Sequence, residues 1–486
     1  MSDPKEDDSK PNLMASVRGS GNEEAFGWRF TAPVFLGSSL NSVNSSLIAT
    51  ALISIASAIH VSIGETVALV AALYLASTVA QPTAGKLSEV FGPRRVFLAG
   101  MMAALIGGLV GGFGHDLTTL IASRVLIGIG TSTGYPSAML LVRRRAEWAG
   151  LSAPPGGVLG GLVVTAMVTP AIGLPLGGLL VAAWGWQAVF LVNVPLALIT
   201  LCMTAFWIPR DDPIKSSRTF KEIATRIDLG GIIVFSAAMS TLLVFLLSLP
   251  TTNWISLGLA IISGLVLVWW ELRASHPFID IRLLATNRGL TLSYLRFALA
   301  SLCVYTVLYG VTQWTEVVRG ISAEDAGLLL VPMTLVGGVL ALPISRRNLV
   351  RAPLIAAAVS CLIASIGVLF IGSTTPILWV VVITSIFGIT LGASVSANQT
   401  TLYTEATADQ IGTASGLLRT FGYIGSIASS ALISIFFHQS VTDDGLHTIA
   451  LVMVILSFVG LVIVLADRRI MAQKRAEKHG STSKMP

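Results

Sequence analysis

The amino-acid sequence predicts an all-α integral membrane protein with about fourteen membrane-spanning helices. Of its 486 residues, 53% are hydrophobic and only 12% are charged, about half the charged fraction of a typical soluble domain. A soluble fold of this length cannot bury so much apolar surface, because even a 300-residue domain leaves roughly a quarter of its chain surface in water. The surrounding solvent is therefore expected to be lipid. The net charge of +6 comes without a dense basic stripe, which argues against a nucleic-acid partner.

Fourteen apolar runs are long enough to cross a bilayer, which takes about 20 residues of helix. They lie near residues 32–56, 66–84, 95–114, 118–142, 156–182, 187–208, 229–249, 254–270, 289–313, 325–344, 352–372, 376–398, 411–437 and 447–467. An even number of spans places both termini on the same side of the membrane.

The loops between the runs predict which side that is. Alternate loops are basic, with residues such as Arg94, Arg143 and Lys221, whereas the opposite loops are mainly acidic, with residues such as Asp116 and Asp444. Short cytoplasmic loops carry an excess of Lys and Arg. We therefore expect a multi-pass protein of the cell (inner or plasma) membrane with both termini in the cytoplasm.

The longest internal loop, residues 209–227, separates six runs from eight. The halves show a weak internal repeat, since Arg124-Val-Leu-Ile-Gly-Ile-Gly130 resembles Ile386-Phe-Gly-Ile-Thr-Leu-Gly-Ala393, and parallel repeats are typical of transporters. The expected organisation is a disordered N-terminus (1–30), a six-helix bundle (31–208), a loop with a two-helix hairpin (209–286), a second six-helix bundle (287–467) and a basic tail (468–486).

The loop between the second and third runs has a distinctive pattern, Gly85-Lys-Leu-Ser-Glu-Val-Phe-Gly-Pro-Arg-Arg95. Gly85 allows close approach of another helix, and Glu89 can offer its carboxylate to a helix N-terminus. Gly92 turns the chain, while Arg94 and Arg95 can pair with Glu89. The pattern resembles the signature loop of the major facilitator superfamily, with Glu in place of the usual Asp. The resemblance implies that this loop takes part in the conformational switch.

Further motifs extend the resemblance over residues 30–467. Thr169-Pro-Ala-Ile-Gly-Leu-Pro-Leu-Gly-Gly178 is similar to the "antiporter motif" of the family, and Trp184-Gly-Trp-Gln-Ala-Val-Phe-Leu-Val-Asn-Val-Pro195 and His276-Pro-Phe-Ile-Asp-Ile-Arg-Leu-Leu284 resemble its fourteen-spanner drug:proton antiporter branch. This branch implies two six-helix bundles plus an inserted two-helix hairpin, and multidrug efflux by proton antiport. The motif residues expected at the bundle interface are Gly173, Pro175, Gly177 and Gly178.

The first run departs from the pattern of this branch in a way that bears on mechanism. Where such exporters usually carry an Asp, the stretch Asn44-Ser-Ser-Leu-Ile-Ala-Thr-Ala-Leu-Ile53 begins with Asn, which cannot take up and release a proton. The candidates for proton coupling are therefore Glu316, at the outer end of its run, and Arg124. The alternative for Glu316 is a solvated loop acid beside Arg319.

Three arginines, Arg124, Arg296 and Arg419, lie inside apolar runs. A charge at membrane depth is costly and needs carbonyls, water or an anion as its partner, although packing or snorkelling is the alternative for each. Arg296 and Arg419, together with polar and aromatic residues of other runs, form the predicted substrate cavity. The candidates are Asn44, Tyr74, Arg296, Tyr305, Tyr309, Gln313, Asn398, Arg419 and Tyr423.

The leading hypothesis is a monomeric efflux antiporter whose partners are a small organic substrate, protons and the lipid bilayer. An alternative is a carrier of a specific organic anion with an arginine-lined cavity, and a non-transporting sensor on the same fold is a third hypothesis. The six histidines and three cysteines have no metal-ligand spacing, so neither a metal nor another cofactor is expected. An enzyme would need acids, histidines or cysteines clustered at one depth, and the sequence predicts no such cluster.

Overall fold

The computed structural model describes residues 25–61, 63–151, 153–212, 220–321, 323–407, 410–438 and 440–467. These residues form helices and connecting loops, with no strand among them. Most of the predicted N-terminal segment 1–30 and all of the tail 468–486 lie outside the described residues. Each of the fourteen predicted runs falls on one helix or on two or three consecutive ones.

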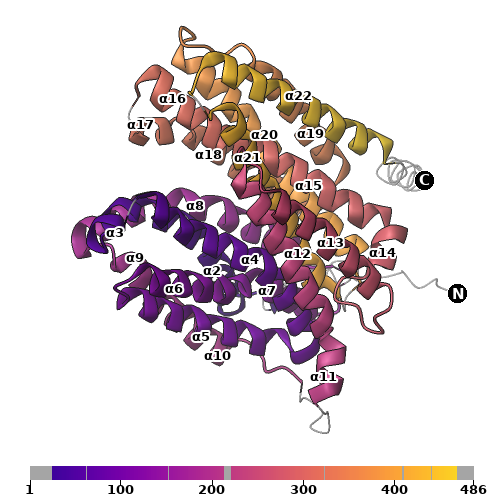
Figure 1. The fold of residues 1–486 in the computed structure, drawn as a ribbon. Coiled ribbons are helices and arrows are strands. Elements are labelled where there is room, and N and C mark those ends of the chain that lie inside the picture. Colours follow the sequence, from indigo (N-terminus) through magenta and orange to yellow (C-terminus); the bar gives the residue numbers. More distant parts are fainter. Residues whose placement is uncertain are drawn as a thin grey trace, which may run out of the picture.

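The first half of the chain forms one bundle, drawn in indigo and purple in Figure 1. Within it α2 packs on α8, α4 on α6, and α5 on both α6 and α10. Its elements are α2 (Trp28–Leu47), η1 (Ile48–Thr50), α3 (Leu52–Ala58), α4 (Ile63–Phe91), α5 (Pro93–Gly112), α6 (Leu117–Ser132), α7 (Gly134–Trp148), α8 (Gly156–Trp184), α9 (Ala188–Leu191) and α10 (Asn193–Trp207).

The second half forms the other bundle, drawn in red, orange and yellow. Here α18 packs on α20, α15 on α21, and α19 on both α20 and α22. Its elements are α15 (Arg288–Thr306), the π-helix η2 (Val307–Val311), α16 (Thr312–Arg319), α17 (Ala323–Leu328), α18 (Val331–Arg346), α19 (Arg351–Val368), α20 (Ile377–Glu405), α21 (Ile411–Phe436) and α22 (Asp443–Ala466).

Between the halves lie α11 (Phe220–Ile227), α12 (Leu229–Ser248), α13 (Trp254–Glu271) and α14 (Ile281–Thr286). Helices α12 and α13 pack on each other as a hairpin, and α12 also packs on α4 of the first bundle and α21 of the second. The outer face of α13 exposes large apolar side chains such as Ile255, Ile262 and Leu265. The hairpin therefore lies at the edge of the seam between the bundles, with an apolar face suited to lipid.

The first apolar run is not one straight helix. Segments Trp28–Thr50 and Leu52–Ala58 meet at 59°. Just before the break, where α2 gives way to η1, the backbone N–H of Ile48 bonds to Ser46 O, while the carbonyl of Asn44, its α-helical partner, accepts from the Arg124 guanidinium at 3.1 Å. A side chain that takes over a helical carbonyl is a recognised cause of a bend.

Eleven helices of the described chain are long and apolar enough to cross a membrane, or twelve if the bent segment at residues 28–58 counts as one span. Helix α21, which carries Arg419 and many Ser, Thr and Gly residues, is not among them. The protein is thus an all-helical integral membrane protein, and the count of fourteen spans stays a prediction.

Candidate functional site

The two bundles are in close contact at the end of α4, where the signature loop begins. A Cβ on Gly85 would lie 2.3 Å from the backbone of Gly412 on α21, so the contact requires glycine. One residue further along α21, Thr413 donates its backbone N–H to Glu89 Oε1 at 2.7 Å and its hydroxyl to Glu89 Oε2 at 3.0 Å. The carboxylate of one bundle thus lies at the N-terminus of a helix in the other, where the helix dipole stabilises negative charge.

The arginines of the loop gather around an acid that was not among the predicted site residues. Glu89 was predicted to pair with Arg94 and Arg95, but its carboxylate points to α21. The acid beside these two arginines is Asp211, which lies at the start of α5. Its carboxylate accepts the backbone N–H groups of Arg94 at 3.3 Å and Arg95 at 2.8 Å, and the Arg144 guanidinium lies 3.6 Å away. Gly92 makes the turn with a φ of +97°, a conformation that favours glycine.

Deeper in the seam, an uncharged hydrogen-bond network joins the bundles. The Tyr423 hydroxyl on α21 donates to Asn41 Oδ1 on α2 and accepts from Gln81 Nε2 on α4 at 3.0 Å. Asn41 Nδ2 in turn donates to Ser77 at 2.9 Å and Thr131 at 3.0 Å. Only Tyr423 is a predicted residue of this network. The available signal for Asn41 and Gln81 was an amide side chain inside an apolar run.

A second contact across the seam uses α7 of the first bundle. The Arg419 guanidinium lies over the Tyr135 ring at 4.0 Å from its centroid, and the Tyr403 hydroxyl on α20 donates to Met139 O at 3.0 Å. Arg419 therefore lies at the seam with an aromatic ring as its partner, and its place in a substrate cavity stays a prediction. Asn398 is buried on α20, and its amide donates to Ser394 O of its own helix at 2.9 Å.

Aromatic side chains continue the seam from Tyr423. The Tyr74 ring lies edge-on to the Tyr423 ring with 5.9 Å between the ring centroids, and the centroids of the Tyr305 and Tyr309 rings are 5.7 Å apart. Tyr309 and Gln313 then line a cavity of about 440 Å³ between α16 and the outer part of α21, a volume within the range of drug-sized pockets. Its other lining residues are Ser430, Ile433, Ser434, Phe437 and His438.

Two predicted residues lie inside the first bundle and not at the seam. Arg124 is buried, with Nε donating to Leu69 O and Nη2 to Asn44 O, each at 3.1 Å. The Asn44 side chain pairs reciprocally with Asn193 on α10, at 2.6 and 2.9 Å. The prediction that Asn44 lines the cavity therefore disagrees with the structure, because its side-chain amide is hydrogen-bonded to Asn193 between α2 and α10.

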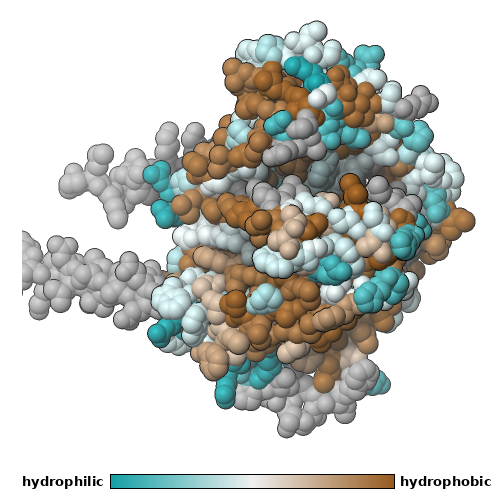
Figure 2. All heavy atoms as spheres, turned by 90° about the vertical axis from the view of Figure 1, so that its left-hand side faces the viewer, coloured by the Kyte–Doolittle hydropathy of each residue, from teal (hydrophilic) through white to brown (hydrophobic). Residues whose placement is uncertain are grey.

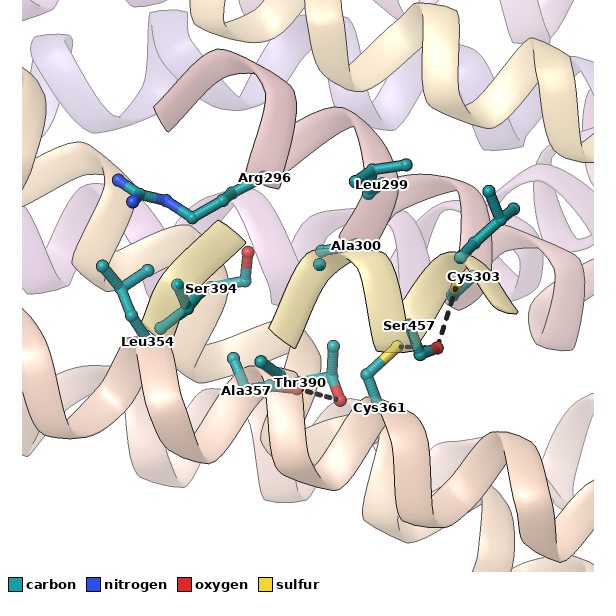
Figure 3. Close-up of a pocket in the computed structure, with 14 residues that line it drawn as sticks. Arg296, Leu299, Ala300, Cys303, Leu354, Ala357, Cys361, Thr390, Ser394 and Ser457 are labelled. Atoms are coloured by element: carbon teal, nitrogen blue, oxygen red, sulfur yellow. Dashed lines mark hydrogen bonds between the residues drawn. The ribbon is translucent and has the colours of Figure 1, made fainter. Parts of the chain in front are cut away.

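Arg296 lies inside the second bundle, which also differs from the prediction. Its guanidinium pairs with Asp467 at 2.9 Å and donates to Ser293 at 3.0 Å. Figure 3 shows it at one end of a narrow pocket, of about 40 Å³, enclosed by helices of this bundle, with Cys303, Cys361 and Ser457 at the other end. The charge of Arg296 is thus balanced by a carboxylate away from the seam.

Glu316 is half-buried near the outer end of α16. Arg319, its alternative partner, donates to Thr375 O at 2.5 Å and Gly372 O at 3.4 Å. The hydrogen bonds of Arg319 thus go to backbone carbonyls and not to Glu316.

The antiporter-like motif lies on α8, where it packs within the first bundle. A Cβ on Gly173 would meet Ser46 of α2, and one on Gly177 would meet Thr50 and Leu47. Gly178 faces open space, and the Pro175 side chain lies outside the described residues. The contact of α8 with the other bundle is made earlier, where Gly156 and Gly160 pack on Ser345 of α18. Gly173 and Gly177 therefore pack within the first bundle and not at the bundle interface that was predicted for them.

Comparison with known proteins agrees with this architecture. A sequence model described as Major Facilitator Superfamily matches residues 34–430. An uncharacterised MFS-type transporter of Bacillus subtilis, YwoD, is 31% identical over 434 residues, which cover 88% of this chain and 94% of the relative. The tetracenomycin C resistance and export protein of Streptomyces glaucescens is 28% identical, with 86% and 77% covered.

A solved structure shares the fold. The human organic anion transporter MFSD10 (TETRAN) superposes with a TM-score of 0.60 at 16% identity, covering 90% of this chain and 99% of that one.

Proposed function

The chain belongs to the Major Facilitator Superfamily, and from that premise we propose that it exports organic compounds in exchange for protons by alternating access of its two bundles. The observation that carries this proposal is the hydrogen-bond network Asn41–Tyr423–Gln81. It joins α2 and α4 to α21 through neutral groups, which water can replace when the bundles part. Such contacts suit a seam that opens and closes.

The structure corresponds, in this proposal, to an outward-facing state. The bundles touch at the signature-loop end through Gly85, Glu89 and Thr413. The opposite side, with α3, α9, α16 and α17, faces the viewer in Figure 2, where the surface is hollowed between two lobes. Basic residues mark the signature-loop side as cytoplasmic.

The lining of the 440 Å³ cavity supports an organic substrate. Tyrosine and phenylalanine rings offer stacking surfaces, and hydroxyl, amide and imidazole groups offer hydrogen bonds. The names of relatives support export, since one is a resistance and export protein and another a multidrug resistance protein of Mycobacterium tuberculosis, 26% identical.

Transport of a specific organic anion is the second candidate. It is favoured by Arg419 at the seam and by the human structural neighbour, which is named an organic anion transporter. Of the three embedded arginines, however, Arg296 is balanced by Asp467 and Arg124 is held by carbonyls within one bundle. One arginine at the seam gives a weaker preference for anions than three would.

For proton coupling we propose Glu316 as the first residue to test, because Asn44 has no titratable proton and is paired with Asn193. We further propose the fourteen-span topology with α12–α13 as the inserted hairpin, a monomer, cytoplasmic termini, and bundles at 31–208 and 287–467.

The test is transport by the purified protein in liposomes under an imposed pH gradient, with organic compounds of both charge signs. We expect proton-driven accumulation of some of them, and loss of the pH-driven component in Glu316→Gln with substrate exchange retained. Transport whose rate and accumulation do not depend on the pH gradient would refute proton coupling. A strict preference for anions that Arg419→Gln abolishes would instead favour the organic anion carrier.

A further inference from the structure

The signature-loop end of the hairpin contains two neighbouring carboxylates that the proposed transport mechanism does not use. Asp228 precedes α12 and Glu271 ends α13, and they are only 5% and 3% exposed. A Cβ placed on Gly231 would lie 2.3 Å from Asp228 Oδ2 and 2.8 Å from Glu271 Oε1. Both acids are thus aimed at one point beside the backbone of α12.

The two carboxylates differ in their hydrogen bonds. Asp228 is fully engaged: Oδ1 accepts from Gly231 N at 3.0 Å and Trp270 Nε1 at 2.8 Å, and Oδ2 accepts from Phe278 N at 3.0 Å. These three donors occupy both oxygens of Asp228. Neither oxygen of Glu271 has a well-aligned hydrogen-bond partner among the described residues, and its polar neighbours are the backbone amides of Phe278 and Ile279 and the Asp228 carboxyl group.

Among the described residues, no Lys or Arg forms a salt bridge with Glu271. From α4, Lys86 donates to Pro277 O at 2.7 Å, and Glu89 is bound to Thr413. In the linker between α13 and α14, residues 272–280, Arg273 lies over the Trp269 ring and His276 is exposed. Asp280 caps α14, and Arg282 at the start of α14 donates to Leu272 O. The charged residues of α11, Lys221, Glu222 and Arg226, are exposed, and α21 contributes Arg419 at the seam.

A buried carboxylate with neither a well-aligned donor nor a paired cation is too costly to stay ionised beside a second carboxylate, and such a group neutralises instead. We infer that Asp228 and Glu271 form a proton-binding site that holds one proton, carried by Glu271 and shared with Asp228. The proton removes the repulsion between the two carboxylates, so that they can lie side by side. Asp228 in turn accepts the backbone N–H of Phe278 in the linker. Because Lys86 of the signature loop binds the adjacent Pro277, this proton ties the hairpin to the loop that closes the bundles.

Infrared spectroscopy of the full-length protein in lipid tests the site without any transport assay. At neutral pH we expect a carbonyl band of a protonated carboxylic acid that Glu271→Gln lacks. The control Glu147→Gln, which removes an exposed acid paired with Arg143 at 2.8 Å, should keep the band. Coincident spectra of the wild type and Glu271→Gln in this region would overturn the assignment.

Thermal unfolding gives a second readout that needs no spectral assignment. A proton bound in the folded state and lost on unfolding makes stability fall as pH rises. The wild type should therefore lose stability from neutral to alkaline pH relative to Glu271→Gln, whose neutral amide needs no proton. Parallel pH curves would overturn the inference, and so would stabilisation of the wild type alone by sodium ions, which would show a metal ion in place of the proton. If Glu271→Gln does not fold, loss of the wild-type band at alkaline pH supports the site, and its persistence overturns it.

Discussion

At the scale of single residues, one carboxylate contributes to closure of the signature-loop side. Glu89 receives both donors of Thr413 at the start of α21. A carboxylate at a helix N-terminus contributes about 0.3–2 kcal/mol, roughly a two- to thirtyfold shift in an equilibrium. Its contribution is made only while the bundles touch.

We therefore expect Glu89→Gln to slow turnover more than it weakens substrate binding, because the closed state loses the charge–dipole interaction while the cavity is untouched. The measurement is kcat and KM for transport in liposomes. Asp116→Asn is a matched control, since Asp116 caps α6 through Thr119 at 2.9 Å within one bundle. Wild-type turnover in Glu89→Gln at normal expression would count against the role of this contact.

The buried pair Arg296–Asp467 leads to a prediction about stability and not about substrate choice. Removing one partner of a buried ion pair typically destabilises a protein by about 3–5 kcal/mol. Asp467→Asn should therefore lower the unfolding temperature, and the double variant Arg296→Met, Asp467→Leu should recover much of the loss. The charge preference for substrates should not change, because the pair lies inside the second bundle. A changed preference in the folded double variant would place Arg296 in the substrate path after all.

At the scale of elements, α4 and α21 approach so closely that no side chain fits between Gly85 and Gly412. We expect Gly85→Ala to force the two helices apart and to disfavour the state in which they touch. A cysteine introduced at Thr413 should then react faster with a water-soluble thiol reagent. Gly178→Ala is the control, because a Cβ there meets nothing within 4 Å. Equal reactivity in both variants would contradict a tight contact at this point.

The helices themselves could be predicted from the sequence because lipid imposes a simple rule of about 20 apolar residues per span. The bend between Thr50 and Leu52 could not, since it follows a turn in which the Asn44 carbonyl accepts from the Arg124 guanidinium. The π-helical segment Val307–Val311 inside the ninth run likewise has no signal in an apolar pattern. Helix α21 shows the limit of the rule, because it packs at the seam and tolerates polar residues.

Residues of the candidate site were harder to predict than the helices that carry them. Glu89, Tyr423 and Arg419 lie at the seam, but Asn44 and Arg296 turn away from it, because Asn193 and Asp467 offer them partners inside each bundle. Such partners lie more than a hundred residues away in the chain. Depth in a span can be inferred from sequence spacing, whereas the direction of a side chain around the helix axis depends on tertiary packing.

At the scale of the whole molecule, we propose that the two bundles alternate between opening on one side and opening on the other. The most direct test is a pair of spin-label distances in the protein in lipid. One pair joins the signature-loop ends of the bundles, at the exposed positions Glu147 and Arg347, and the other joins the opposite ends, at His115 and Thr374. On addition of transported substrate or a change of pH, we predict that the first distance lengthens while the second shortens. Two distances that stay constant, or that lengthen together, would contradict alternating access.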